Sequence, residues 1–233
     1  MDFDLIINSF PKLLFASITT LKLLSVSLFI GLFIGLFFAI LRIKNNIILG
    51  KIAYGYSYTF RGTPLLVQIF IIYYGLPQFE YIQDSMFWII LREPTGCAIL
   101  ALTLNTGAYV SEILRGGVLA VNRGLIEAGS ALGMNARHRF IYITTPIAIR
   151  IALPSYSNDV VSLLKSTALA STITITDMTG IARTIVSKTY APYEIFVSLA
   201  IVYMICTFII QKFFGFIENK MSNYTKIDSD NDK

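Results

Sequence analysis

Residues 127–133 read Glu-Ala-Gly-Ser-Ala-Leu-Gly, and the function of this run depends on the sequence around it. Small side chains on a short helix let another surface approach the backbone closely. Gly133 suits the turn that ends such a helix, and we expect Glu127 near its start, where the helix dipole favours an anion. On its own, the run fits either a docking helix or an ordinary capped surface helix.

The flanking sequence has the composition of a membrane protein. Of the 233 residues, 55% are hydrophobic and 14% are charged, whereas a soluble domain usually carries about 25% charged residues. The net charge of +5 does not indicate a nucleic-acid surface, because the basic residues lie in short segments beside apolar runs, the pattern of cytoplasmic loops. Cys97 and Cys206 are expected as buried thiols, and His138 as a solvated loop residue, so we expect no metal site.

Five segments are candidates for membrane-spanning helices, each of which needs about 20 mostly apolar residues. They lie at about 18–41, 62–79, 94–111, 151–176 and 193–211. Gly31 and Gly35 form a small-xxx-small pair in the first, typical of close helix packing. The fourth is weaker, because it is interrupted by Pro154, Asn158, Asp159 and Lys165. The sequence thus predicts an all-α, polytopic membrane protein of about five transmembrane helices.

The distribution of lysine and arginine predicts the orientation. With an external N-terminus and five crossings, thirteen of these residues fall inside and four outside, and cytoplasmic loops are the ones that collect positive charge. We therefore expect residues 1–17 outside and a transmembrane domain over 18–215. Its basic cytoplasmic loop spans about 115–150, and 216–233 form a cytoplasmic tail that is disordered at its end. The 127–133 run then faces the cytoplasm.

This loop resembles that of the permeases of polar amino-acid ABC importers. Their loop has the form Glu-Ala-Ala, three residues, Gly, nine residues, Ile-x-Leu-Pro. Here it reads Glu127-Ala128-Gly129, three residues, Gly133, nine residues, Ile143-Thr144-Thr145-Pro146, with departures at Gly129 and Thr145. Further stretches that resemble the family, in the expected order over about residues 15–220, are Phe60–Gln68, Tyr73–Pro77, Gly107–Glu112, Leu153-Pro154 with Asn158, and Leu163–Leu169.

The resemblance implies a type I importer permease in the bacterial inner membrane, moving a polar amino acid. It implies a dimer with a second copy or a homologue, two ABC ATPase subunits and an extracytoplasmic solute-binding protein. Contact with the ATPase would involve Glu127, Ala128, Gly129, Ala131, Leu132 and Gly133. The sequence has no Gly-x-x-x-x-Gly-Lys-Ser/Thr loop, the motif that cradles nucleotide phosphates. We therefore expect a transport subunit that is not an enzyme and holds no cofactor, with ATP and Mg bound by the partner.

Three polar residues within or beside the spans are candidates for the substrate path. An ionisable group inside a bilayer costs about 2.5–3.5 kcal/mol even on insertion scales. Lys165 is expected either to hold a substrate carboxylate, or to form an ion pair or snorkel to the interface. Glu112 either receives the substrate's amino group or ends the third helix, and Asn105 either contacts the ligand or bonds across helices.

Two neighbouring motifs bear on this path. Arg61-Gly62-Thr63-Pro64 favours the turn that starts a helix over a ligand site. Ser166 stands where many relatives carry an acid, which disfavours arginine or lysine as the substrate.

Two other classes of function stay open. A stand-alone secondary carrier or channel would give the 127–133 run no purpose. An intramembrane enzyme would need a catalytic group, for which Lys165 with Ser162, Ser166 or Ser171 is the only hint. Neither the identity of the amino acid nor the choice between homodimer and heterodimer follows from the sequence.

Overall fold

The computed structural model describes residues 3–43 and 46–222, and every regular element in those ranges is helical. The α-helices are α1 (Phe3–Ile43), α2 (Ile47–Gly62), α3 (Leu65–Phe70), α4 (Glu80–Gln83), α5 (Trp88–Leu91), α6 (Pro94–Leu119), α7 (Arg123–Ala131), α8 (Ala136–Arg139), α9 (Thr145–Ser166), α10 (Met178–Thr189) and α11 (Pro192–Ser222). The other helical turns are the π-helices η1 (Ile71–Gly75) and η3 (Phe140–Thr144) and the 3₁₀ helices η2 (Leu76–Gln78) and η4 (Thr167–Ile173).

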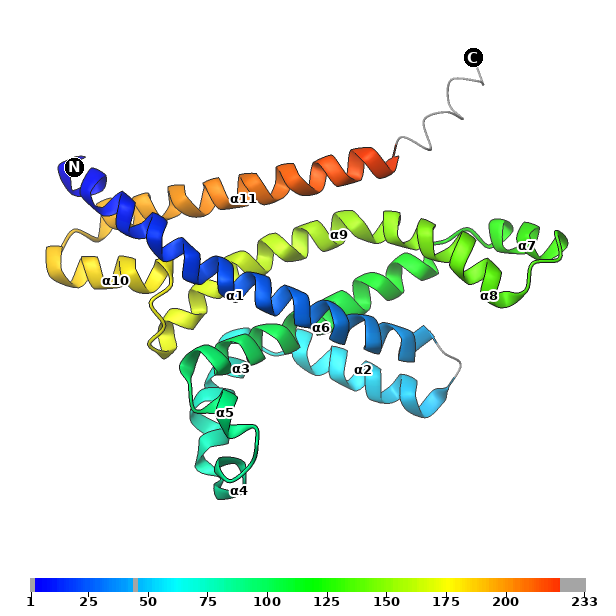
Figure 1. Cartoon of the computed structure of the whole chain (residues 1–233), viewed down its shortest axis with the longest axis horizontal. Helices are drawn as coiled ribbons and strands as arrows, with labels where there is room; N and C mark the ends of the chain where they lie inside the picture. Colours follow the sequence, from blue (N-terminus) through cyan, green and yellow to red (C-terminus); the bar gives the residue numbers. More distant parts are fainter. Residues whose placement is uncertain (1–2, 44–45, 223–233) are drawn as a thin grey trace, which may run out of the picture.

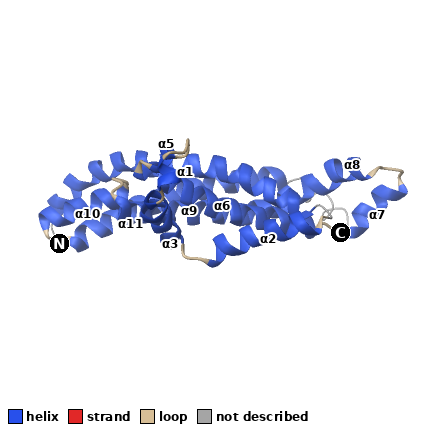
Figure 2. Ribbon diagram, turned by 90° about the horizontal axis from the view of Figure 1, so that it is seen from below, coloured by secondary structure: helices blue, strands red, loops and turns tan. Residues whose placement is uncertain are grey.

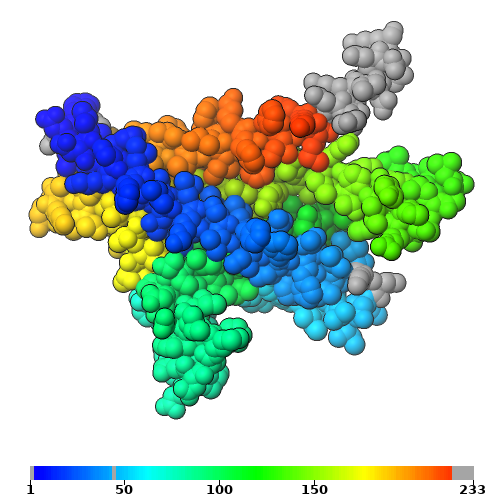
Figure 3. All heavy atoms as spheres, in the orientation of Figure 1, coloured from blue at the N-terminus to red at the C-terminus, as the bar shows by residue number. Residues whose placement is uncertain are grey.

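The long helices α1, α6, α9 and α11 run lengthwise through an elongated bundle, and α2 lies beside the second half of α1 (Figure 1). Seen from below, the bundle is flattened (Figure 2). Helices α7 and α8 project at one end, here called the loop end, and the beginning of α1 lies with α10 at the other. The segment that contains α4 and α5 protrudes from the flank, as the space-filling view shows (Figure 3).

Close contact between α1 and α6 depends on glycine. A Cβ at Gly31 would lie 3.1 Å from the side chain of Thr106, and one at Gly35 would lie 2.5 Å from Val110. The backbones approach this closely because the small-xxx-small pair presents no side chains at the contact. The close packing expected of Gly31 and Gly35 is therefore confirmed.

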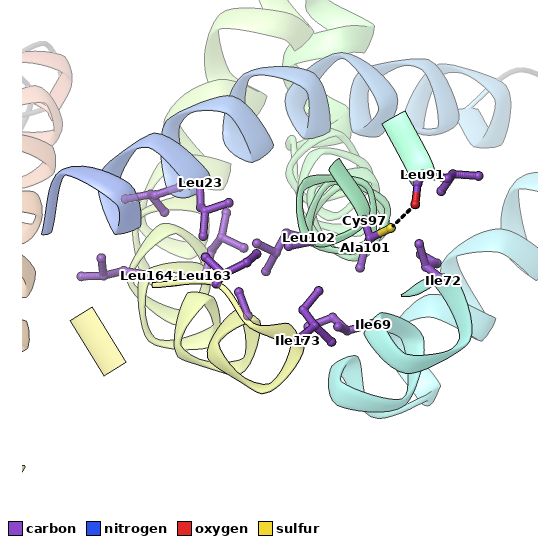
Figure 4. Packing of buried hydrophobic residues seen from close by; sticks show 14 residues of the cluster. Leu23, Ile69, Ile72, Leu91, Cys97, Ala101, Leu102, Leu163, Leu164 and Ile173 are labelled. Carbon is purple, nitrogen blue, oxygen red and sulfur yellow. Dashed lines mark hydrogen bonds between the residues drawn. The ribbon is translucent and has the colours of Figure 1, made fainter. Parts of the chain in front are cut away.

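The main hydrophobic core lies where α1, α3, α6, α9 and η4 converge (Figure 4). Leu23, Ile69, Leu102, Leu164 and Ile173 are almost completely buried there. Cys97 lies in the same cluster and donates its thiol hydrogen to the carbonyl of Leu91, 3.2 Å away. These side chains come from segments far apart in the sequence, so this core fixes how the long helices are arranged.

Several helix limits differ from those expected. Helix α1 begins at Phe3, so most of the segment expected to precede the first span is helical, and α6 and α11 extend past their expected ends to Leu119 and Ser222. Helix α11 therefore takes in the start of the expected tail, whose end lies outside the described residues. The second expected span is divided among α3, η1 and η2.

Three described helices are long and apolar enough to cross a membrane: Phe3–Ile43, Pro94–Leu119 and Pro192–Met221. Helix α9 falls short of that standard because polar residues line one of its faces. The count of five crossings and the orientation of the termini stay predictions.

The glycine contact predicts opposite effects for two Gly→Ala changes. Gly35→Ala should destabilise the protein by about 1–3 kcal/mol, because the added methyl group overpacks the α1–α6 contact. Gly55→Ala on α2 meets nothing within 4 Å and should stabilise it by up to about 1 kcal/mol through helix propensity. Thermal unfolding of both variants in detergent measures the difference. Equal shifts of the two midpoints would contradict this account.

Candidate functional site

Helix α7 is closed at both ends by local hydrogen bonds. Asn122 caps its start by accepting a hydrogen bond from the backbone N–H of Gly124, at 2.8 Å. At its end, Gly133 has a φ of +78°, and the N–H groups of Gly133 and Met134 donate to the carbonyls of Ser130 and Gly129, each at 3.0 Å. This is a Schellman ending, in which glycine takes the left-handed position without strain.

The expectation that Glu127 lies near the helix start is wrong. The helix begins at Arg123, so Glu127 is in its middle, where the dipole gives a carboxylate little advantage. The capping residue is Asn122, five positions before Glu127, so the first turn of the helix precedes the 127–133 run.

The residues of the 127–133 run divide between two faces of α7. Glu127, Ala128, Ala131, Leu132 and Gly133 are exposed, and Leu132 is 83% exposed. Gly129 is buried on the opposite face, where an added Cβ would lie 2.7 Å from Cδ1 of Ile143. The exposed face is free for a partner, whereas Gly129 packs α7 against η3.

The break between α2 and α3 is stabilised by two amide side chains. Nε2 of Gln68 donates to the carbonyls of Phe60 and Thr63, at 2.8 and 3.0 Å. Nδ2 of Asn105, from α6, donates to the same Phe60 carbonyl at 2.9 Å and to Oε1 of Gln68 at 3.2 Å. These bonds satisfy carbonyls that the end of a helix leaves without partners.

A cavity of about 700 Å³, here called the central cavity, lies between this break, α6 and α9. Arg61 and Asn105 line one side, with Tyr109 beside them. The guanidinium of Arg61 lies over the ring of Tyr109, 5.2 Å from its centre. Helix α9 lines the other side with a face of polar residues: Ser155, Asn158, Asp159, Ser162 and Ser166. The cavity thus holds one cation and one anion on different walls.

A second cavity, of about 580 Å³ and here called the arginine cavity, lies between α1, α2 and α6. The carboxylate of Glu112 forms ion pairs there with Arg42 of α1, Arg115 of α6 and Arg61 of α2. The Arg115 contact is 2.9 Å and that to Arg61 is 3.9 Å. The two cavities share Arg61, Gly62 and Thr63 as a common wall.

The structure places the three path candidates in different surroundings. Asn105 lines the central cavity and also forms the hydrogen bonds across helices considered for it. Glu112 lines the arginine cavity, and α6 continues beyond it, so it does not end that helix. Lys165 is exposed in the last turn of α9 and lines neither cavity. The part each plays in the substrate path stays a prediction.

Asp159 was not among the candidates from the sequence, and for Arg61-Gly62-Thr63-Pro64 the sequence favoured a helix-starting turn over a ligand site, whereas Arg61 lines both cavities. Ser155, Asp159, Ser162 and Ser166 recur every three or four positions, the spacing that puts residues on one face of a helix. That periodicity marks the polar face of α9. The motif that contains Arg61 does form the turn before α3, and the same residues line the central cavity. Among the described residues, no group of three or more His, Cys, Asp or Glu side chains could hold a metal ion.

Comparison with known proteins identifies the family. Residues 9–223 match the model for the binding-protein-dependent transport system inner membrane component. The chain belongs to this family. The nopaline transport system permease protein of Agrobacterium fabrum is 51% identical over 213 residues, with 91% of this chain and 88% of that protein covered.

Other relatives extend this picture. The octopine transport system permease protein of Rhizobium meliloti is 46% identical, with coverage of 91% and 86%. The histidine/lysine/arginine/ornithine permease protein of Escherichia coli K12 is 39% identical, with coverage of 89% and 87%. The crystal structure of an amino acid ABC transporter with histidines superposes with a TM-score of 0.84 at 33% identity, covering 94% of this chain and 99% of that one. The protein is therefore an inner-membrane permease of the ABC importer class with the fold of that family.

The amide contacts at the break predict an effect on stability. Gln68→Met keeps the volume but removes one donor from the Phe60 carbonyl, which keeps its bond from Asn105, and the amide donor from the Thr63 carbonyl, so it should cost about 1–3 kcal/mol of unfolding free energy. Gln78→Met is the matched control, because the exposed Gln78 donates only to the carbonyl of Tyr74; it should change stability by less than about 0.5 kcal/mol. Unfolding in detergent compares the two, and an equal loss would show that the Gln68 contacts do not stabilise the break.

Proposed function

We propose that this chain is the membrane subunit of an ATP-driven importer whose α7 docks into a separate ABC ATPase. The observation that carries the proposal is the exposed face of α7, with Leu132 projecting from a short helix capped at both ends. A rigid knob with one apolar side chain at its tip suits a groove on a partner. The loop end then faces the cytoplasm, and ATP and Mg are bound by the ATPase.

The central cavity is the proposed substrate site. Arg61 presents a guanidinium, the side chain best shaped for a carboxylate, and Asp159 presents a carboxylate to an ammonium or guanidinium group. A cavity with both charges on separate walls suits an amino acid. Relatives named for histidine, lysine, arginine and ornithine, or for nopaline and octopine, support a cationic amino acid or a derivative of one.

This proposal replaces the inference from Ser166. Taken alone, Ser166 in place of an acid disfavours a cationic substrate. Ser166 does line the central cavity, but so does Asp159, about two turns earlier on the same face of α9. An acid for a cationic side chain is therefore present in the cavity at another position.

The remaining partners follow from the family's description as a binding-protein-dependent system. We propose a second permease, identical or homologous, and an extracytoplasmic solute-binding protein that delivers the substrate. A carrier that works alone is the rival function, and a requirement for the ATPase distinguishes the two.

Binding of the ATPase tests the α7 interface. The double variant Glu127→Lys with Leu132→Asp should reduce retention of the cognate ATPase in a pull-down by at least about tenfold, since it alters both the charge and the apolar tip of the knob. Both side chains are exposed, so thermal stability should change little. Lys220→Glu, a charge reversal at the exposed end of α11, is the control and should bind normally. Equal retention by all three forms would leave α7 an ordinary surface helix.

Uptake tests the central cavity. In proteoliposomes that contain the whole transporter, Asp159→Asn should raise the KM for arginine by about tenfold or more, because one charge-assisted contact is lost. Asp84→Asn, the same change at an exposed acid before α5, should leave the KM unaltered. An Asp159→Asn variant with native KM for arginine would place the substrate elsewhere.

A further inference from the structure

We infer that the arginine cavity is a second binding site, specific for the carboxylate of the transported amino acid on its way out to the cytoplasm. The inference rests on the proposed function, which supplies the substrate and the cytoplasmic position of the loop end. It adds a site beyond the central cavity and assigns it a ligand.

The first argument is position along α6. On α6 the central cavity is lined from Asn105 to Ile113 and the arginine cavity by Glu112 and Arg115, so the two stretches overlap at Ile113 and the arginine cavity reaches about half a turn nearer the loop end. The two cavities meet at Arg61, whose backbone is fixed beside the break by the bonds to Phe60. A carboxylate bound to Arg61 in the first cavity is therefore already at the wall of the second.

The second argument is charge. Arg42, Arg61 and Arg115 surround the single carboxylate of Glu112, and no other acid is among the described side chains that line this cavity. Even when Asp159 of the neighbouring cavity is counted as a partner of Arg61, the guanidinium groups outnumber the carboxylates. Positive charge that is not matched in a partly buried site attracts an anion.

The third argument is which arginines have room for a ligand. The side chains of Arg42 and Glu112 are each 15% exposed, whereas those of Arg115 and Arg61 are 29% and 42% exposed. An aromatic ring lies 5.2 Å from the guanidinium of Arg42 and of Arg61 alike, so the greater exposure of Arg61 and Arg115 is what distinguishes them from Arg42. Arg61 and Arg115 thus share Glu112 while keeping donor groups open to the cavity, and a guanidinium presents five N–H donors in all.

These features give Glu112 a defined part. It is a resident competitor for the same guanidinium groups, so it keeps the affinity for a passing carboxylate low. A release site needs that property, because a site that bound the amino acid tightly would retain it. Arg61 and Arg115 bind the carboxylate, and Glu112 is a positioning residue that limits how long it stays.

Inhibition of import from the inner side tests this assignment. The complete transporter, with its ATPase and binding protein, is reconstituted in proteoliposomes with ATP inside, and arginine is added to the lumen at increasing concentration. Lumenal arginine should inhibit import by the native transporter, and argininamide, which lacks the carboxylate, should not. Arg115→Gln should raise the inhibitory concentration of arginine about tenfold. Lys51→Gln, which removes an exposed cation from α2 outside the cavity, should leave it unchanged.

Glu112→Gln supplies the decisive comparison, because it should shift the inhibitory concentration in the opposite direction, downward. Misfolding does not produce opposite shifts from two neighbouring residues. The proposal is overturned if Arg115→Gln has the inhibitory concentration of the native transporter, or if argininamide inhibits as well as arginine. It is also overturned if the effect of Arg115→Gln appears only in vesicles that contain phosphatidylglycerol, since the cavity would then hold a lipid phosphate. If any of these results is found while the native transporter still imports arginine with ATP, only the second site is refuted and the proposed function stands. If the native transporter shows no ATP-dependent import, the second site and the proposed function are both refuted.

Discussion

A backbone carbonyl without a hydrogen-bond partner is costly inside a bilayer, and this constraint governs the break between α2 and α3. The chain interrupts a helix at residues 62–64 and meets the demand with two amide side chains, Gln68 and Asn105. The carbonyl of Phe60 accepts from both. These bonds stabilise the interruption. Arg61, in the last turn of α2, therefore lies at the point where the two cavities meet. A straight helix here would remove the shared wall.

The rest of the bundle holds α6 in position to supply Asn105. Gly31 and Gly35 bring α1 against one side of α6, while α9 packs on another and contributes the polar face of the central cavity. The arrangement separates two tasks. Apolar packing near Leu102 and Leu164 fixes the helices, and the polar groups lie where helices end or break. Charged side chains are therefore concentrated at a few points of an otherwise apolar protein.

A structural feature could be predicted from the sequence where the residues that determine it lie close together along the chain. The helical membrane class, the Gly31–Gly35 contact and the turn at Gly133 depend on local composition or spacing, so they were predictable. The start of α1 packs with α10 and α11, far along the chain. The separate helix α2 and the surroundings of Arg61 depend on contacts with α6, more than 40 positions away in the case of Phe60 and Asn105. Gly129 shows the same limit: its size reads as a docking feature, but its burial against Ile143 is set by a neighbouring helix.

At the loop end, α7 is joined by a packing contact to the helix that lines the central cavity. Gly129 packs on Ile143, and Ile143 belongs to a helical stretch that runs from α8 through η3 into α9 without a loop. The same stretch carries Asp159. One continuous helical stretch therefore connects the contact with α7 to the wall of the central cavity. This stretch contains the π-helical turn η3 and two prolines, Pro146 and Pro154, and both features are places where a helix bends most readily. If a partner displaced α7 as proposed, the displacement would reach the cavity as a tilt of α9 about one of these positions.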